Sequence, residues 1–221
     1  MVKILILCAL KVELQFLQAN FSKIIEKGEY PFKFFFSDYK NLKIISAKCG
    51  LGKIRSASFT QYAIDNLDFD LIVNFGSCGQ IDENVTIGDL IFCTETIEYD
   101  FYTVRDFIPR FKVNHNIPEE YFDKFCIKKG ILLTATQNID SKAKKQYLKN
   151  TFNGTVGDWE GAAISQVSTL NKKKFFIFKT ITDRGEENLI DDYKKSFEEV
   201  LEKNSKKMLD FLSFLNQKEC L

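Results

Sequence analysis

The chain has 221 residues, of which 45% are hydrophobic, and its formal net charge is +1. This length supports one substantial domain with a core of its own, and nothing in the composition requires a second domain. Acidic and basic residues are interspersed, so the charge pattern gives no surface for nucleic acid or for an anionic membrane. We therefore expect a single domain over residues 1–221 that acts on a small molecule.

Strand-like and helix-like segments alternate from the first residues onward. Lys3 to Ala9 is a nearly continuous apolar strand; the apolar run is too brief for a signal peptide and no convincing cleavage site follows it. Leu10 to Phe21 continues with helical spacing of its apolar residues. Residues 32–37 and 42–47 then predict an antiparallel hairpin, which makes the expected sheet a mixed one.

The same alternation continues to the end of the chain. The further expected elements are helices over 56–67, 160–170 and 196–215 and strands over 71–75, 89–97, 131–134 and 175–181. We expect the strand at 71–75 to stop at the Gly76-Ser77-Cys78-Gly79 segment, and the irregular stretch from Phe101 to Glu119 to form a lid or an interface loop. This pattern predicts an α/β fold, a single-domain three-layer sandwich in which helices flank a mixed, twisted central sheet.

Six cysteines are scattered through the sequence, at positions 8, 49, 78, 93, 126 and 220. They form no Cys-x-x-Cys pair, and His115 is the only histidine that could join them as a metal ligand. The sequence therefore indicates neither a zinc site nor a disulfide framework. Buried thiols in a reducing cytoplasm are the simplest interpretation.

Polar residues collect where predicted strands end, which is where open α/β sheets bind ligands. They occur at Glu13, in the Gly76–Gly79 segment, in Asp158-Trp159-Glu160 and in Thr182-Asp183. Each also has an ordinary structural explanation: a solvated acid, a tight turn, a helix N-cap, and a turn cap or an ion pair with the next residue. Glycines at 76 and 79 would let the backbone approach a ligand closely. Trp159 would add a flat apolar wall.

Several common mechanisms lack their residues in this chain. Gly50-Leu51-Gly52 has no third glycine of a dinucleotide fingerprint, no Gly-Lys-Ser/Thr of a P-loop occurs, and the single histidine makes a Ser-His-Asp triad untenable. Carboxylate chemistry remains. Three acids around a pocket are typical of glycosidic bond cleavage, in which one acid protonates the leaving group and another activates water.

The order and spacing of these motifs resemble the purine nucleoside phosphorylase and nucleosidase superfamily over nearly the whole chain. The matching residues are Ala9 and Glu13, Gly50-Leu51-Gly52-Lys53-Ile54, Asn74-Phe75-Gly76-Ser77-Cys78-Gly79, Trp159-Glu160-Gly161-Ala162 and Thr182-Asp183. Within the superfamily the chain looks most like the 5'-methylthioadenosine/S-adenosylhomocysteine nucleosidases, which hydrolyse the N-glycosidic bond of an adenosine thioether.

The resemblance implies roles for individual residues. Asp183 would protonate the purine at N7, and its pKa should therefore be raised; Glu13 would deprotonate the attacking water with support from Ser77; and Glu160 would bind the ribose hydroxyls. Further substrate contacts are implied at Cys78, Gly79, Asn138, Ile139, Trp159, Lys179 and Thr182. The resemblance also implies no cofactor, no metal, a cytoplasmic location and a homodimer in which the aromatic stretch from Phe101 to Pro109 helps to close the neighbouring pocket.

Two alternatives stay open at this stage. Phosphorolysis is the first, although the glycine-arginine signature after the first strand is replaced by Leu10-Lys11-Val12-Glu13 and the arginine before the Gly-Ser segment is replaced by Asn74. Lys53 and Arg55 are the remaining candidates for binding an anion. The second alternative is a catalytically silent nucleoside-binding protein of the same fold. Trp159 stands where the nucleosidases usually have methionine, which leaves the identity of the base open, including a 6-oxopurine.

Overall fold

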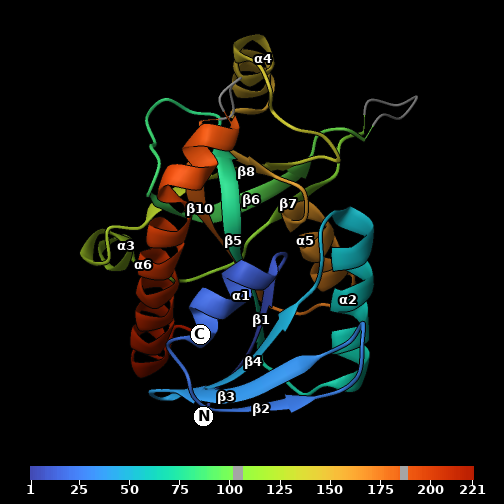
Figure 1. Cartoon of the computed structure of the whole chain (residues 1–221), viewed down its shortest axis with the longest axis vertical. Coiled ribbons are helices and arrows are strands. Elements are labelled where there is room, and N and C mark those ends of the chain that lie inside the picture. The colour runs from blue at the N-terminus through green and yellow to red at the C-terminus, as the bar shows by residue number, and fades with distance from the viewer. Residues whose placement is uncertain (102–106, 185–188) are drawn as a thin grey trace.

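The structure of the protein is a computed structural model that describes residues 1–101, 107–184 and 189–221 (Figure 1). Its strands are β1 (Lys3–Cys8), β2 (Ser22–Lys27), β3 (Phe34–Tyr39), β4 (Leu42–Lys48), β5 (Leu71–Gln80), β6 (Leu90–Glu98), β7 (Arg110–Lys112), β8 (Lys128–Thr134), β9 (Val156–Asp158) and β10 (Phe175–Asp183). Its helices are α1 (Lys11–Gln18), α2 (Lys53–Asn66), α3 (Glu119–Lys124), α4 (Lys142–Phe152), α5 (Gly161–Leu170) and α6 (Leu189–Gln217). The predicted α/β class with a mixed sheet is confirmed.

The central strands are buried on both faces, which explains their continuous apolar sequences. β1 pairs in parallel with β4 and β5, and its residues from Ile4 to Cys8 are fully buried. A parallel strand between two helical layers has no solvent-facing side, so the sequence shows no alternation there. The predicted hairpin is confirmed as β3 and β4, with Tyr39 paired to Leu42 across the turn.

Five strands close into a ring, which the sequence did not predict. β5 pairs with β10, β10 with β6, β6 with β8, β8 with β9, and β9 returns to β5. The register shifts within β10 and β6 mark irregularities that help a sheet to bend. Closure brings the carboxyl ends of β5 and β10 next to β9, and this corner of the sheet carries most of the polar residues singled out above.

Helices cover both faces of the sheet. α1 and α6 lie together on one side, with α6 packed on β10, whereas α2 and α5 pack on each other on the opposite side (Figure 1). One large apolar cluster runs through the sheet and both layers, and a smaller one lies near β8, β9 and α4. Within the described residues, no helix is both long and apolar enough to cross a membrane.

Two predictions about local structure need correction or completion. The strand expected to stop at Phe75 continues as β5 to Gln80, so Gly76-Ser77-Cys78-Gly79 is part of a strand and not a turn. Its glycines serve close packing, because a Cβ at Gly76 would lie 2.9 Å from Glu13 Oε1 and a Cβ at Gly79 2.9 Å from Asp183 Oδ1. Within the stretch from Phe101 to Glu119, residues 102–106 lie outside the described part of the chain, and β7 lies in the remainder.

Candidate active site

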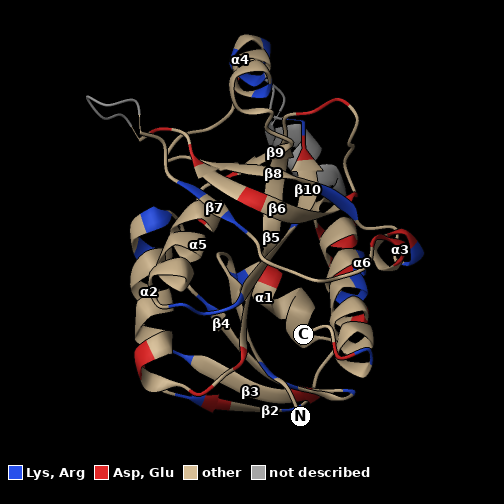
Figure 2. Cartoon of the chain, turned by 180° about the vertical axis from the view of Figure 1, so that it is seen from behind, with Lys and Arg blue, Asp and Glu red and all other residues tan. Residues whose placement is uncertain are grey.

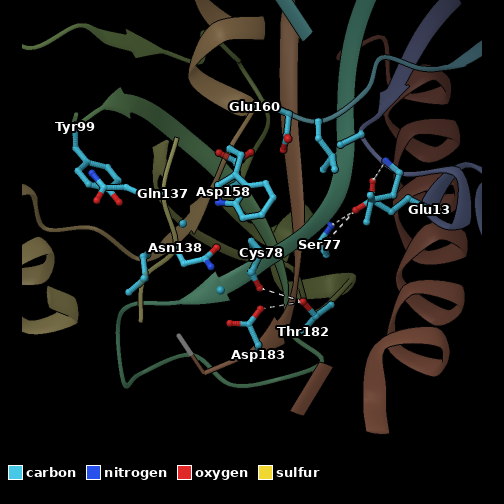
Figure 3. Close-up of a pocket in the computed structure, with 17 residues that line it drawn as sticks. Glu13, Ser77, Cys78, Tyr99, Gln137, Asn138, Asp158, Glu160, Thr182 and Asp183 are labelled. Carbon is cyan, nitrogen blue, oxygen red and sulfur yellow. Dashed lines mark hydrogen bonds between the residues drawn. The ribbon is translucent and has the colours of Figure 1, made fainter. Parts of the chain in front are cut away.

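A cavity of about 450 Å³ opens where β5, β9 and β10 end (Figure 3). Ten of the eleven residues predicted from the sequence line it: Glu13, Ser77, Cys78, Gly79, Asn138, Ile139, Trp159, Glu160, Thr182 and Asp183. The eleventh, Lys179, lies beneath the cavity and is fully buried. The volume falls within the usual range for small-molecule sites.

Glu13 is fixed from two directions at the start of α1. Its Oε2 accepts a hydrogen bond from the backbone N–H of Leu10 at 2.9 Å, as an acid in the first helical turn commonly does. Its Oε1 accepts from both the backbone N–H and the hydroxyl of Ser77, each at 2.8 Å (Figure 3). The absence of a side chain at Gly76 leaves room for this carboxylate against β5. Glu13 is only 2% exposed, so this is not a solvated surface acid.

Glu160 reaches the cavity from the connection between β9 and α5. Its Oε1 accepts a hydrogen bond from the backbone N–H of Gly52 at 2.7 Å, which ties the segment before α2 to the wall of the pocket. Burial and the negative charge of Asp158 raise the pKa of Glu160 to about 7, although Lys179 and the Gly52 N–H act in the opposite direction. A carboxyl group with this pKa changes charge near neutral pH.

Asp183 is the last residue of β10 and is 8% exposed. The hydroxyl of Thr182 lies 3.3 Å from its Oδ2 and 3.4 Å from the carbonyl oxygen of Cys78 (Figure 3). Because Gly79 pairs with Asp183 across β5 and β10 and has no side chain, the carboxylate can lie against the β5 backbone. Figure 3 shows Asp183 on the side of the cavity opposite Glu160.

Asp158 lines the cavity and forms a buried ion pair with Lys179, which lies beneath it. Lys179 Nζ lies 2.8 Å from Asp158 Oδ2, and both side chains are at most 2% exposed. Asp158 also accepts from the N–H of Gly161 at 2.8 Å and from the hydroxyl of Thr134 at 2.6 Å. The neighbouring acids raise the pKa of Lys179 despite its burial. Asp158 thus accepts a hydrogen bond from the first residue of α5, whose N-cap position is Glu160, and the positive charge of Lys179 lies next to it.

The remaining wall of the cavity is apolar and partly aromatic. Trp159 is 39% exposed at the rim of the cavity. Ile139 is buried and packs closely against Gly157: a Cβ added to Gly157 would lie 2.4 Å from Cδ1 of Ile139. Tyr99 and Gln137 also line the cavity and were missed by the sequence analysis. Tyr99 directly follows β6, so the strand-end rule that identified the other residues would have found it.

Cations are missing from this lining. None of the described residues that line the cavity is Lys, Arg or His. Lys53, one of the two cations considered for anion binding, is held by Glu98 at 2.7 Å and Asp100 at 2.6 Å, and Arg55 is exposed. Among the described residues, no group of three or more His, Cys, Asp or Glu side chains could hold a metal ion. The site is therefore built from carboxylates, hydroxyls, side-chain amides and apolar walls.

The fold and this cavity define an α/β protein with a ligand pocket at the carboxyl ends of a mixed, closed sheet. The family model described as "Phosphorylase superfamily" matches residues 3–213, and the chain belongs to that superfamily. The resemblance inferred from the sequence is thereby confirmed at the level of the superfamily.

The individual relatives share at most 28% of their residues with this chain in the comparisons that follow. The chain is 28% identical to the 5'-methylthioadenosine/S-adenosylhomocysteine nucleosidase of Buchnera aphidicola (subspecies Schizaphis graminum), with 92% of this chain and 93% of the relative covered. It is 25% identical to the aminodeoxyfutalosine nucleosidase of Campylobacter jejuni, with 87% and 90% covered. Its fold matches the crystal structure of the Helicobacter pylori 5'-methylthioadenosine/S-adenosylhomocysteine nucleosidase with butyl-thio-DADMe-Immucillin-A at a TM-score of 0.89 and 20% identity, covering 97% and 99% of the two chains.

Proposed function

We propose that this protein is a hydrolase that cleaves the N-glycosidic bond of a purine nucleoside. The observation that carries the proposal is the convergence of Glu13, Glu160 and Asp183, from three separate elements, on one cavity of nucleoside size. Glycosidic cleavage needs an acid for the leaving group and a base for water, and the surplus carboxylate suits a hydroxylated sugar. The names of the nucleosidase relatives support the same reaction.

Asp183 is the proposed general acid. Proton transfer from its carboxyl group to N7 of the purine lets the C1'–N9 bond break with the electron pair leaving on a neutral base. The role requires an Asp183 that is protonated when substrate binds. Its burial at the end of β10 supports this assignment.

Glu13 is the proposed general base. It accepts a proton from water as the water oxygen bonds to C1' of the developing oxocarbenium ion. The hydrogen bonds from Leu10 and Ser77 fix the direction of its carboxylate without using a cation. Ser77 is thus a positioning residue for the base as well as part of the cavity wall.

Glu160 is the proposed ligand of the ribose 2'- and 3'-hydroxyls. A carboxylate there orients the ring and places negative charge beside the oxocarbenium ion, an interaction that is strongest in the transition state. Burial, which raises the pKa of Glu160 to about 7, also keeps water from competing for it. In this scheme Trp159 packs on the sugar, while Cys78, Gly79, Asn138, Ile139 and Thr182 surround the base and Lys179 acts through Asp158 from below.

Water is favoured over phosphate as the nucleophile. A phosphate dianion needs cationic or multiple N–H donors, but the described lining of the cavity offers no cation and Lys53 is already paired. Asn74, in place of the phosphorylase arginine, donates instead to the carbonyl of Leu7 at 3.0 Å. Retention of all three acids also argues against a silent binding protein.

We further propose a 5'-methylthioadenosine- or S-adenosylhomocysteine-like substrate, a single functional domain over the chain, a cytoplasmic location in methionine salvage, and a homodimer. The predominantly apolar lining, which includes Leu10 and Leu51, suits an alkylthio group at the 5' position. Phe101 and Phe107, which are 41% and 62% exposed, are the proposed contacts to the second copy.

The test is the release of free purine from methylthioadenosine, adenosylhomocysteine, adenosine, inosine and futalosine, each with and without phosphate. We expect phosphate-independent release, with the two thioethers preferred. Release that depends on phosphate and yields ribose 1-phosphate would establish phosphorolysis instead. No release from any of the five would refute the enzymatic proposal.

A further inference from the structure

A second cavity, of about 600 Å³, lies between β7, the end of α5 and the start of β10. It is lined by Arg110, Phe111, Lys112, Asn114, Asn116, Thr169, Lys172, Lys173, Lys174 and Phe175. Five of these ten residues are cations and none is an acid. Figure 2 shows the corresponding basic stretches on β7 and in the connection that follows α5. This is a concave site of one charge sign on a protein whose net charge is only +1.

The cations in this cavity outnumber the acids beside them. Glu95 lies 3.6 Å from Arg110 and is directly opposite Lys112 in the pairing of β6 with β7. Across the described residues, none of the four lysines makes an ion pair; Lys173 and Lys174 instead lie over the rings of Phe69 and Phe176, at 5.2 Å and 5.5 Å from the ring centres. Like charges held together repel one another unless an anion binds between them.

The end of α5 explains only part of this arrangement. Lysines at a helix C-terminus interact favourably with its dipole, which accounts for Lys172 and Lys173. It does not account for Arg110 and Lys112, which come from an edge strand more than fifty residues earlier in the chain. Edge strands do carry lysines that prevent aggregation, but such residues point into solvent and need not border a cavity shared with another cationic segment.

We propose that this cavity binds an anionic ligand that carries a chain of two or more phosphate groups, such as inorganic polyphosphate or a nucleoside polyphosphate. A single phosphate would use two or three donors, whereas five cations together with the amides of Asn114 and Asn116 match several phosphate groups in a row. Phe111 at the side of the cavity offers a flat surface for a ring attached to that chain.

The proposed site is separate from the nucleoside pocket. Phe175 begins β10 and Asp183 ends it, so the two cavities lie at opposite ends of this strand, roughly 26 Å apart for extended backbone. α5 likewise begins beside Glu160 and ends beside the basic cavity. A ligand in the basic cavity therefore cannot be a part of the nucleoside substrate.

Titration calorimetry with sodium tripolyphosphate tests the proposal on the full chain. We expect saturable binding with one ligand per chain, and about tenfold weaker binding when Lys172→Gln and Lys174→Gln are combined, since two charge-assisted contacts are lost. The matched control combines Lys203→Gln and Lys206→Gln, two exposed lysines of α6 outside the cavity, and should bind as the unmodified chain does. Purine release should be unchanged in both variants.

Two further measurements show where the ligand binds and which class of ligand it is. Trp159 is the only tryptophan and lines the other cavity, so its fluorescence should not change when tripolyphosphate binds. Tighter binding of ATP than of tripolyphosphate, lost in the Lys172/Lys174 variant, would assign the site to nucleoside polyphosphates; equal binding would assign it to the phosphate chain alone. Absence of saturable binding, equal weakening in the control, a change in Trp159 fluorescence, or binding of single-stranded RNA without binding of tripolyphosphate would each overturn the proposal.

Discussion

The ionised form of Glu160 destabilises the folded protein because this carboxylate is buried, and Glu160→Gln should remove that destabilisation. The pKa of about 7 in the folded protein, against an ordinary value of 4.5, means that folding favours the protonated form. The stability associated with this preference is fully present below about pH 4.5 and is lost as the pH rises to about 7. The difference corresponds to roughly 3 kcal/mol of destabilisation at pH 8 that a neutral side chain would not carry.

Glutamine is the suitable replacement because its carbonyl oxygen can still accept the hydrogen bond from Gly52. At pH 8 we expect the variant to be more stable than the unmodified chain by up to about 3 kcal/mol, which for a protein of this size is roughly 6–12 °C in Tm. At pH 4.5 the two should melt together. At the same time the loss of the ribose ligand should lower kcat/KM about a hundredfold or more.

Differential scanning calorimetry at pH 4.5, 6 and 8, together with purine release assays, measures both effects. Glu83 is an exposed acid in a loop, and Glu83→Gln is the matched control. This variant should have the Tm of the unmodified chain at each pH and the same activity. A Tm gain that is the same at pH 4.5 and pH 8, or no gain at all, would show that the buried charge is not what destabilises the protein. Unchanged activity would remove Glu160 from the ribose site.

Three further substitutions test other parts of the site. Asp183→Asn should lower kcat by several orders of magnitude with little change in Tm, and near-normal turnover would refute its role as the acid. Gly79→Ala places a Cβ 2.9 Å from Asp183 Oδ1 and should reduce kcat at least about tenfold while the fold persists; unchanged kcat would mean that the acid need not lie there. Lys179→Met leaves Asp158 charged and buried, so urea denaturation should show a loss of about 3–5 kcal/mol, which adding Asp158→Asn should partly restore.

The fold class was predictable because fully buried strands have continuous apolar sequences that can be recognised directly. β10 is buried along its whole length and β1 from Ile4 onward, and their sequences are almost uninterrupted apolar runs, while α6 carries a helical period. β2 was missed for the opposite reason: all six of its residues are exposed on the edge of the sheet, so neither alternation nor a run of apolar residues marks it. Ring closure was missed because pairings such as β9 with β5 join segments about 75 residues apart, and nothing local encodes them.

The candidate site shows the same division between local and long-range information. Glu13, Glu160 and Asp183 were predicted because each is a polar residue where a strand gives way to another element, and all three line the cavity. The extension of β5 through Gly76 and Gly79 was not found, because glycine in a sequence signals a turn unless one knows what packs against it. Here two carboxylates from other elements pack against it, and the glycines are the reason they can. Two glycines three residues apart, such as Gly76 and Gly79 near the end of the apolar strand β5, are thus better interpreted as the place where carboxylates from other elements pack against the sheet.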